Sequence, residues 1–164
     1  MYEKLTEAKL AETLEAGIHE FAERGVEKAS MASIAGKAGI SVGVLYKYYS
    51  DKDSFFLACV RRSVGRLEEA LKEVLVREDK VSGYADQVIR ILQRHAAEHR
   101  DDIRMYHEIT SIRNSRFAAE LAEEIEKITA GLYTDIIRKA QKNGTVREDM
   151  DPGIAAFFFD NLLM

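Results

Sequence analysis

Residues 30–52 read SMASIAGKAGISVGVLYKYYSDK, and this stretch decides the predicted fold. Ser30 and Ser41 each stand at an N-cap position before a short predicted helix. Gly39 lies between the helices and supplies the positive φ that a tight turn requires. The predicted helices span about 31–38 and 42–48. This is the spacing of a helix-turn-helix, whose second helix can enter the major groove of DNA.

Helices are also predicted on both sides of this motif. Upstream, apolar residues recur every three or four positions from the N-cap Thr6 to Gly25, as in an amphipathic helix. Downstream, Asp51 can cap a long helix. Further helices follow, and the downstream set spans about 52–76, 82–99, 101–113, 116–142 and a start near 152. With a single Pro and long stretches rich in helix-forming residues, the predicted fold class is all-α.

Charge is distributed unevenly along the 164 residues. The chain has a formal net charge of −4, which argues against a basic coat over the whole surface. Four lysines (Lys28, Lys37, Lys47 and Lys52) and one acid (Asp51) lie between residues 28 and 52, a local net charge of +3. The glutamates of the preceding helix, Glu20 among them, are expected to face away from this patch. A local nucleic-acid contact is therefore predicted.

The second short helix is predicted to present an apolar face to DNA. Val42 and Val44 favour contact with thymine methyl groups, and Gly43 lets the backbone approach a base or a phosphate closely. Tyr46, Tyr48 and Lys52 have the spacing expected for phosphate contacts. An ordinary helical hairpin that never contacts DNA is the structural alternative, because the same geometry occurs in such proteins.

The motif resembles a known family, and the residues that carry the resemblance are Ala16-Gly17-Ile18, Phe21, Gly25, Ile34-Ala35, Ala38-Gly39-Ile40-Ser41, Gly43, Leu45-Tyr46, Tyr48-Tyr49 and Ser50-Asp51-Lys52. In this order and spacing they resemble the N-terminal signature of the tetracycline-repressor family. Ala32 stands where some members place a long polar side chain, so the second helix of the module is not expected to contact bases. The resemblance implies these DNA-binding residues: Ser30, Met31, Ser41, Val42, Gly43, Val44, Tyr46, Lys47, Tyr48 and Lys52.

The resemblance also implies how the whole chain is organised. It predicts a three-helix DNA-binding domain at 1–51 and a helical effector-binding and dimerisation domain at 52–164, with 52–76 as the connecting helix. The expected protein is a repressor that binds a palindromic operator as a homodimer and is released by a small apolar or amphipathic effector. The predicted effector pocket comprises Met105, Tyr106, His107, Ile109, Phe117 and Tyr133. The predicted dimer interface comprises Phe157, Phe158, Asn161 and Leu162, in an apolar end that suggests a truncated C-terminus.

Several other classes of protein are disfavoured. No window has the roughly 18 consecutive apolar residues that span a bilayer, and no signal peptide is evident, so a cytoplasmic protein is expected. Cys59 stands alone, and His95 and His99, four residues apart, are a weak metal signal, so we predict neither metal nor cofactor. No catalytic motif occurs, and an enzyme is not expected. The functional alternative is a helical ligand-binding or scaffolding protein with a purely structural helix-turn-helix.

Overall fold

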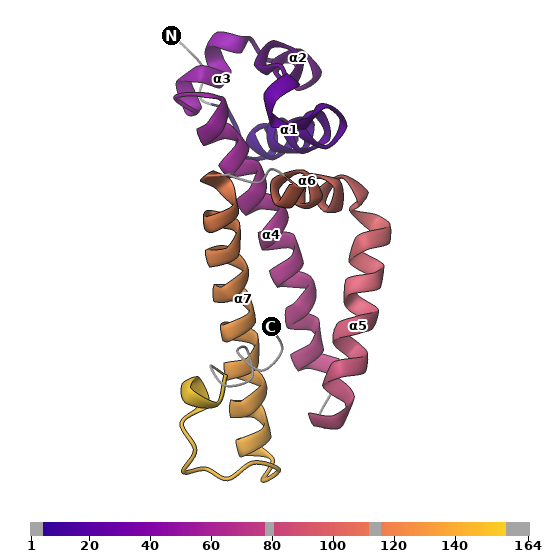
Figure 1. The fold of residues 1–164 in the computed structure, drawn as a ribbon, viewed down its shortest axis with the longest axis vertical. Helices are drawn as coiled ribbons and strands as arrows, with labels where there is room; N and C mark the ends of the chain where they lie inside the picture. The colour runs from indigo at the N-terminus through magenta and orange to yellow at the C-terminus, as the bar shows by residue number, and fades with distance from the viewer. Residues whose placement is uncertain (1–4, 78–80, 112–115, 157–164) are drawn as a thin grey trace. The chain divides into compact units, whose positions relative to one another are not determined.

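The computed structural model describes residues 5–77, 81–111 and 116–156. Every regular element among these residues is a helix, which confirms the all-α prediction (Figure 1). The helices are α1 (Glu7–Lys28), α2 (Met31–Lys37), α3 (Val42–Tyr48), α4 (Lys52–Arg77), α5 (Val81–Glu98), α6 (Arg100–Ser111) and α7 (Arg116–Lys142).

The chain divides into two compact units. Unit 1 comprises Met1–Ser63 and His99–Ala118, and unit 2 comprises Val64–Glu98 and Ala119–Met164. Unit 1 therefore contains the three N-terminal helices, the start of α4 and all of α6, whereas unit 2 contains the rest of α4 with α5 and most of α7. The predicted functional division at residue 51 remains a prediction.

The predicted caps and turn of the helix-turn-helix are confirmed. Ser30 Oγ accepts a hydrogen bond from Ser33 N, and Ser41 Oγ accepts one from Val44 N, at 3.3 and 3.2 Å. After α2, Gly39 adopts a φ of 66°, and Ile40 N donates to Ala35 O at 2.9 Å. A glycine in this conformation followed by such a bond is the Schellman arrangement, which ends a helix and redirects the chain. The turn therefore fixes where α3 begins.

Helix α1 is interrupted close to the predicted stop. Gly25 has a φ of 71° and a ψ of 165°, outside the helical range, before a last helical stretch that ends at Lys28. This backbone region is open essentially to glycine alone. At the other end, Thr6 caps the helix as expected, because its Oγ1 accepts from Lys9 N at 3.2 Å.

The core of unit 1 is aromatic and closely packed. Phe21, Phe55 and Phe56 are almost completely buried, and the rings of Phe21 and Phe56 meet edge to face at 4.9 Å. Helices α1 and α4 approach each other at Gly17. A Cβ added there would lie 2.5 Å from Phe55 Cε1 and 2.7 Å from Cys59 Sγ, so this contact requires a glycine.

The described core of unit 2 is smaller. Leu71 of α4, Ile91 of α5 and Leu132 of α7 form its buried cluster, and partly buried aliphatic side chains surround them. Beside this cluster lies a pocket of about 200 Å³ between α4 and α7. Its lining includes Leu71, Ile128 and Leu132 together with the charged Glu68, Lys72 and Lys127.

Candidate nucleic-acid interface

Helix α3 is fixed in unit 1 by one face and leaves the other open. Leu45 is buried, with 1% of its surface exposed, and anchors the helix. Val42 and Tyr46, one turn apart on α3, are 40% and 46% exposed. Gly43 and Lys47 are exposed beside them. This exposed face includes Val42, Gly43 and Lys47 of the predicted reading face, and it combines aliphatic, aromatic and cationic groups.

Several other predicted DNA-contact residues also stabilise the helix-turn-helix itself. Val44 is half-buried, and the hydroxyls of Ser30 and Ser41 accept the capping bonds from backbone amides. Met31 is 5% exposed, so its side chain belongs to the core. Sequence patterns alone do not distinguish Met31 from an exposed residue at the start of a helix.

The two predicted phosphate-contact residues at the end of the motif also hold neighbouring segments. The hydroxyl of Tyr48 accepts a hydrogen bond from Leu5 N at 2.7 Å, which joins the end of α3 to the chain before α1. Lys52 Nζ donates to Glu27 O at 2.9 Å and joins the start of α4 to the end of α1. A phenol can still donate its proton, and an ammonium has three donors, so both groups retain capacity for a phosphate.

Glu20 corrects the expectation that the glutamates of α1 face away. It is fully buried, its Oε2 accepts from Ser33 Oγ at 3.0 Å and from Lys37 Nζ at 2.9 Å, and Arg24 Nε lies 3.2 Å from its Oε1. The charge of Glu20 is therefore shared between two cations, Lys37 and Arg24, and Lys37 is held by a partner within the protein. The sequence pattern of α1 did not predict the burial of Glu20, a charged residue that directly precedes the core residue Phe21.

The pKa of Glu20 reflects two opposing effects. Burial of the carboxylate by itself raises the pKa. Hydrogen bonds from Lys37 and Ser33, together with the positive charge of Lys37, outweigh burial and hold the pKa below the ordinary value of 4.5. The carboxylate is therefore charged at neutral pH and ties α1 to α2.

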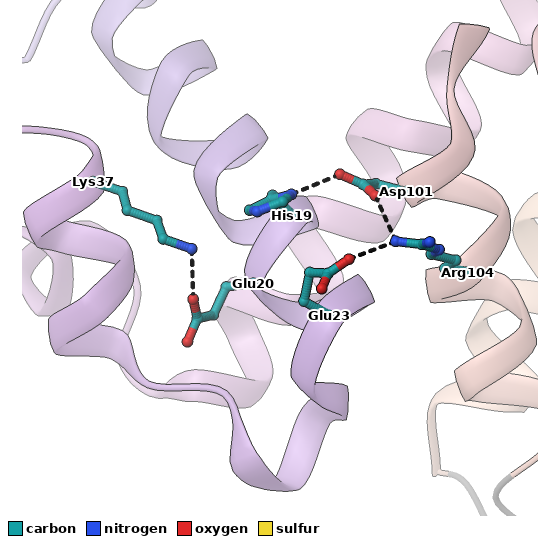
Figure 2. A network of polar contacts seen from close by, with 6 residues as sticks. All are labelled: His19, Glu20, Glu23, Lys37, Asp101 and Arg104. Atoms are coloured by element: carbon teal, nitrogen blue, oxygen red, sulfur yellow. Dashed lines mark hydrogen bonds and ion pairs between the residues drawn. The ribbon is translucent and has the colours of Figure 1, made fainter. Parts of the chain in front are cut away.

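The opposite face of α1 is joined to α6 by ionic contacts that the sequence did not predict (Figure 2). His19 Nδ1 lies 2.9 Å from Asp101 Oδ2, and Arg104 pairs with Glu23 and lies 3.7 Å from Asp101 Oδ1. His19 and Glu23 are one turn apart on α1, as a shared face requires. Helix α1 therefore contacts α6 through one side and α2 through Glu20 on another.

The predicted effector residues fall in both units. Met105 is buried in unit 1, and the Tyr106 hydroxyl lies 2.6 Å from Ser63 Oγ in the same unit. His107 is exposed, and Tyr133 is half-buried in unit 2. None of these four lines the pocket between α4 and α7. The remaining predicted residues lie outside the described side chains: Ile109 and Phe117 of the pocket, and Phe157, Phe158, Asn161 and Leu162 of the dimer interface.

The described residues contain neither a cluster of metal ligands nor a membrane-spanning helix. Among the described residues, no three His, Cys, Asp or Glu side chains converge as metal ligands do; His95 is buried and His99 is partly exposed. Within the same residues, no helix combines the length and the apolar character needed to cross a membrane.

Comparisons with known proteins identify the module. Residues 14–59 match the family model for bacterial regulatory proteins of the tetR family. The fatty acid metabolism regulator protein of Bacillus subtilis is 23% identical over 154 residues, covering 90% of this chain and 75% of that protein. The transcriptional regulator BetI of Yersinia pestis is 37% identical over 73 residues, which are 44% of this chain and 33% of that protein.

A solved structure shares the fold over most of the chain. The regulator FadR of Bacillus subtilis in complex with stearoyl-CoA aligns with a TM-score of 0.65 at 19% identity, covering 93% of this chain and 81% of that one. The motif, its match to the family model and this common fold agree with one another. Residues 14–59 are therefore similar to the N-terminal module of the tetR family of bacterial regulatory proteins, and the fold over most of the chain is similar to that of a solved regulator.

Proposed function

We propose that this chain is a transcriptional repressor that binds a palindromic DNA operator as a homodimer and leaves it when a small amphipathic effector binds. The observation that carries the proposal is the exposed face of α3, which Ser41 and the turn at Gly39 hold in place within a tetR-type module. A helix held this way can place its outer side chains in a major groove. Tyr48 and Lys52, at the edge of the motif, are the proposed backbone contacts.

For the effector we propose a molecule with a long apolar chain and a polar end. The support is the related Bacillus subtilis regulator, whose structure is a complex with stearoyl-CoA. The pocket between α4 and α7, at about 200 Å³, is below the ~300–1,000 Å³ usual for small-molecule sites, so we do not assign the effector to it. Tyr106, His107 or Tyr133 is the proposed contact for its polar end.

We propose that DNA is released through a shift in population between two conformations of the dimer. An effector releases DNA when it binds more tightly to a conformation of the dimer that fits the operator poorly. Helix α4 contributes residues to both units, so it is the proposed mechanical link between them. The effector need contact no DNA-binding residue for this to operate.

The test begins with selection of bound sequences from a random duplex library by the purified chain. Lys47→Ala is expected to weaken binding to the selected duplex about tenfold or more and to reduce its salt dependence, because a cation near phosphates is lost. The control Lys142→Ala, which removes an exposed lysine at the end of α7, is expected to change neither.

The second half of the test uses stearoyl-CoA as the probe, with coenzyme A as its control. Stearoyl-CoA is expected to release the selected duplex in a mobility-shift assay, whereas coenzyme A is not. If no duplex is enriched over the library, DNA binding is contradicted and the scaffolding alternative gains support. If the duplex is enriched but stearoyl-CoA leaves it bound, the proposed effector class is wrong.

A further inference from the structure

The helix-turn-helix presents an unusual set of side chains to its surroundings. Residues 31–48, all of them described, include no Arg, Asn, Gln, Asp or Glu. Arg or Lys with guanine, and Asn or Gln with adenine, are the side chains that read bases through paired hydrogen bonds. Lys47 is the exposed residue of α3 that belongs to this set, so base reading by the rest of that face must rest on other chemistry.

The polar groups of the motif are largely committed within the protein. Ser33 and Lys37 bind the buried Glu20, and Ser30 and Ser41 cap helices. The exposed positions of α2 include Ala32 and Gly36, which carry no polar side-chain group. On α3 the polar tips of the exposed face belong to Tyr46 and Lys47, and its most exposed aliphatic group is Val42.

The exposed face of α3 has open space at Gly43. A Cβ added at Gly43 would meet nothing closer than Ser41 Oγ at 3.9 Å, so packing within the protein does not require glycine there. Alanine would favour the helix, because its helix propensity is higher than that of glycine. A backbone position without a side chain, next to the exposed methyl groups of Val42, allows another molecule to approach α3 closely.

The major-groove edge of DNA offers one apolar group, the methyl at C5 of thymine, and methylated cytosine carries the same group at C5. Given the DNA-binding function proposed above, on which this inference rests, we propose that α3 reads the C5-methyl groups of pyrimidines. Val42 is the specificity-determining residue, and Gly43 lets it come close enough. The operator is then recognised in part by its pattern of methyl groups.

The experiment measures the affinity of the full chain for the duplex enriched by selection and for copies in which single thymines are replaced by uracil. This replacement removes one methyl and leaves the hydrogen-bonding groups of the base unchanged. At a contacted thymine the loss is expected to be about fourfold, as for the burial of one methyl-sized group. In Val42→Ala the same replacement is expected to change affinity less than twofold, because the partner of the methyl is gone.

A matched control truncates another exposed aliphatic side chain. Ile89 of α5 is 52% exposed in unit 2, and Ile89→Ala is expected to keep the fourfold loss. A third duplex carries 5-methylcytosine paired with guanine at the sensitive position. Affinity above that of the unmethylated cytosine duplex extends the reading to methylated cytosine, and equal affinity confines it to thymine.

The outcomes separate this inference from the function on which it rests. If every uracil duplex binds as tightly as its thymine parent, or if Val42→Ala loses the same factor as the unmodified chain, methyl reading by Val42 is overturned while DNA binding stands. If the chain enriches no duplex, the proposed function itself fails. Circular dichroism of Val42→Ala verifies that its helices are retained.

Discussion

The two units bury their described side chains to different degrees. In unit 1, Phe21, Phe55 and Phe56 are enclosed almost completely, and even the charged Glu20 is fully buried with its partners. In unit 2, Leu71, Ile91 and Leu132 form a buried cluster that retains 3–9% exposure, and a pocket opens beside it. Among the described residues, the largest fully buried side chains all lie in unit 1, which also holds α3, the proposed DNA-binding helix.

This difference suits a division of labour. Reading a groove requires side chains held within a fraction of an ångström, which tight packing and satisfied hydrogen bonds provide. A unit that responds to an effector needs alternative arrangements of similar free energy, which a looser core allows. The comparison can be tested by matched changes in the two units, taken here from the largest expected effect to the smallest.

Matched glycine substitutions should separate the two units most clearly. Gly17→Ala places a methyl against Phe55 and Cys59 in unit 1, so the free energy of unfolding is expected to fall by about 1–3 kcal/mol. Gly65→Ala in unit 2 meets nothing within 4 Å and is expected to raise it by about 0.5–1 kcal/mol through helix propensity. Denaturant unfolding followed by circular dichroism measures both. Equal effects would show that α1 and α4 separate at little cost.

The sequence predicted the features of unit 1 that depend on neighbours along the chain. Ser30, Ser41 and Gly39 act through atoms a few residues away, so caps, turn and helix boundaries could be read directly. The ionic contact between His19 and Asp101 joins residues 82 positions apart, and nothing in either local pattern specifies the other. The inclusion of α6 in unit 1 was unpredictable for the same reason.

The candidate site shows the same limit. The exposed face of α3 followed from helical periodicity, because Leu45 is the residue of α3 that faces inward. The buried position of Glu20 did not follow, since a glutamate is rarely enclosed and its partners Ser33 and Lys37 lie on another helix. Counting charge over residues 28–52 therefore left out Glu20 and Arg24, which form ion pairs beside Lys37.

Acid titration should distinguish the buried acid of unit 1 from an exposed one in unit 2. The pKa of Glu20 lies below its ordinary value of 4.5 in the folded chain, so the unfolded state binds more protons near that pH. The stabilisation by Glu20 is therefore complete above about pH 4.5 and is lost as the pH falls through the folded pKa. Glu20→Gln is expected to lower stability by about 1 kcal/mol at pH 7 and to flatten the acid dependence.

The control for this titration is Glu123→Gln, at an exposed pair between Glu123 and Lys127 on α7. The hydrogen bond from Lys127 lowers the pKa of Glu123, but both groups are exposed to solvent, so little effect on stability is expected. Thermal unfolding between pH 3 and pH 7 compares the two variants with the unmodified chain. An unchanged acid dependence in Glu20→Gln would contradict the assignment of Glu20 as the buried tie between α1 and α2.

The smallest expected effect concerns exposed ion pairs between helices, one in each unit. Glu23 and Arg104 join α1 to α6 in unit 1, and Glu73 and Arg94 join α4 to α5 in unit 2 with their atoms 2.9 Å apart. Double-mutant cycles with alanine should give coupling energies of about 0.2–1 kcal/mol for each pair, because solvent screens both. The unit 1 pair is expected to lie at the upper end, because Arg104 also lies 3.7 Å from Asp101, and this second acid helps to hold the guanidinium in place. A larger coupling energy for the unit 2 pair would reverse the comparison, because the greater ionic constraint would then lie in the unit with the looser core.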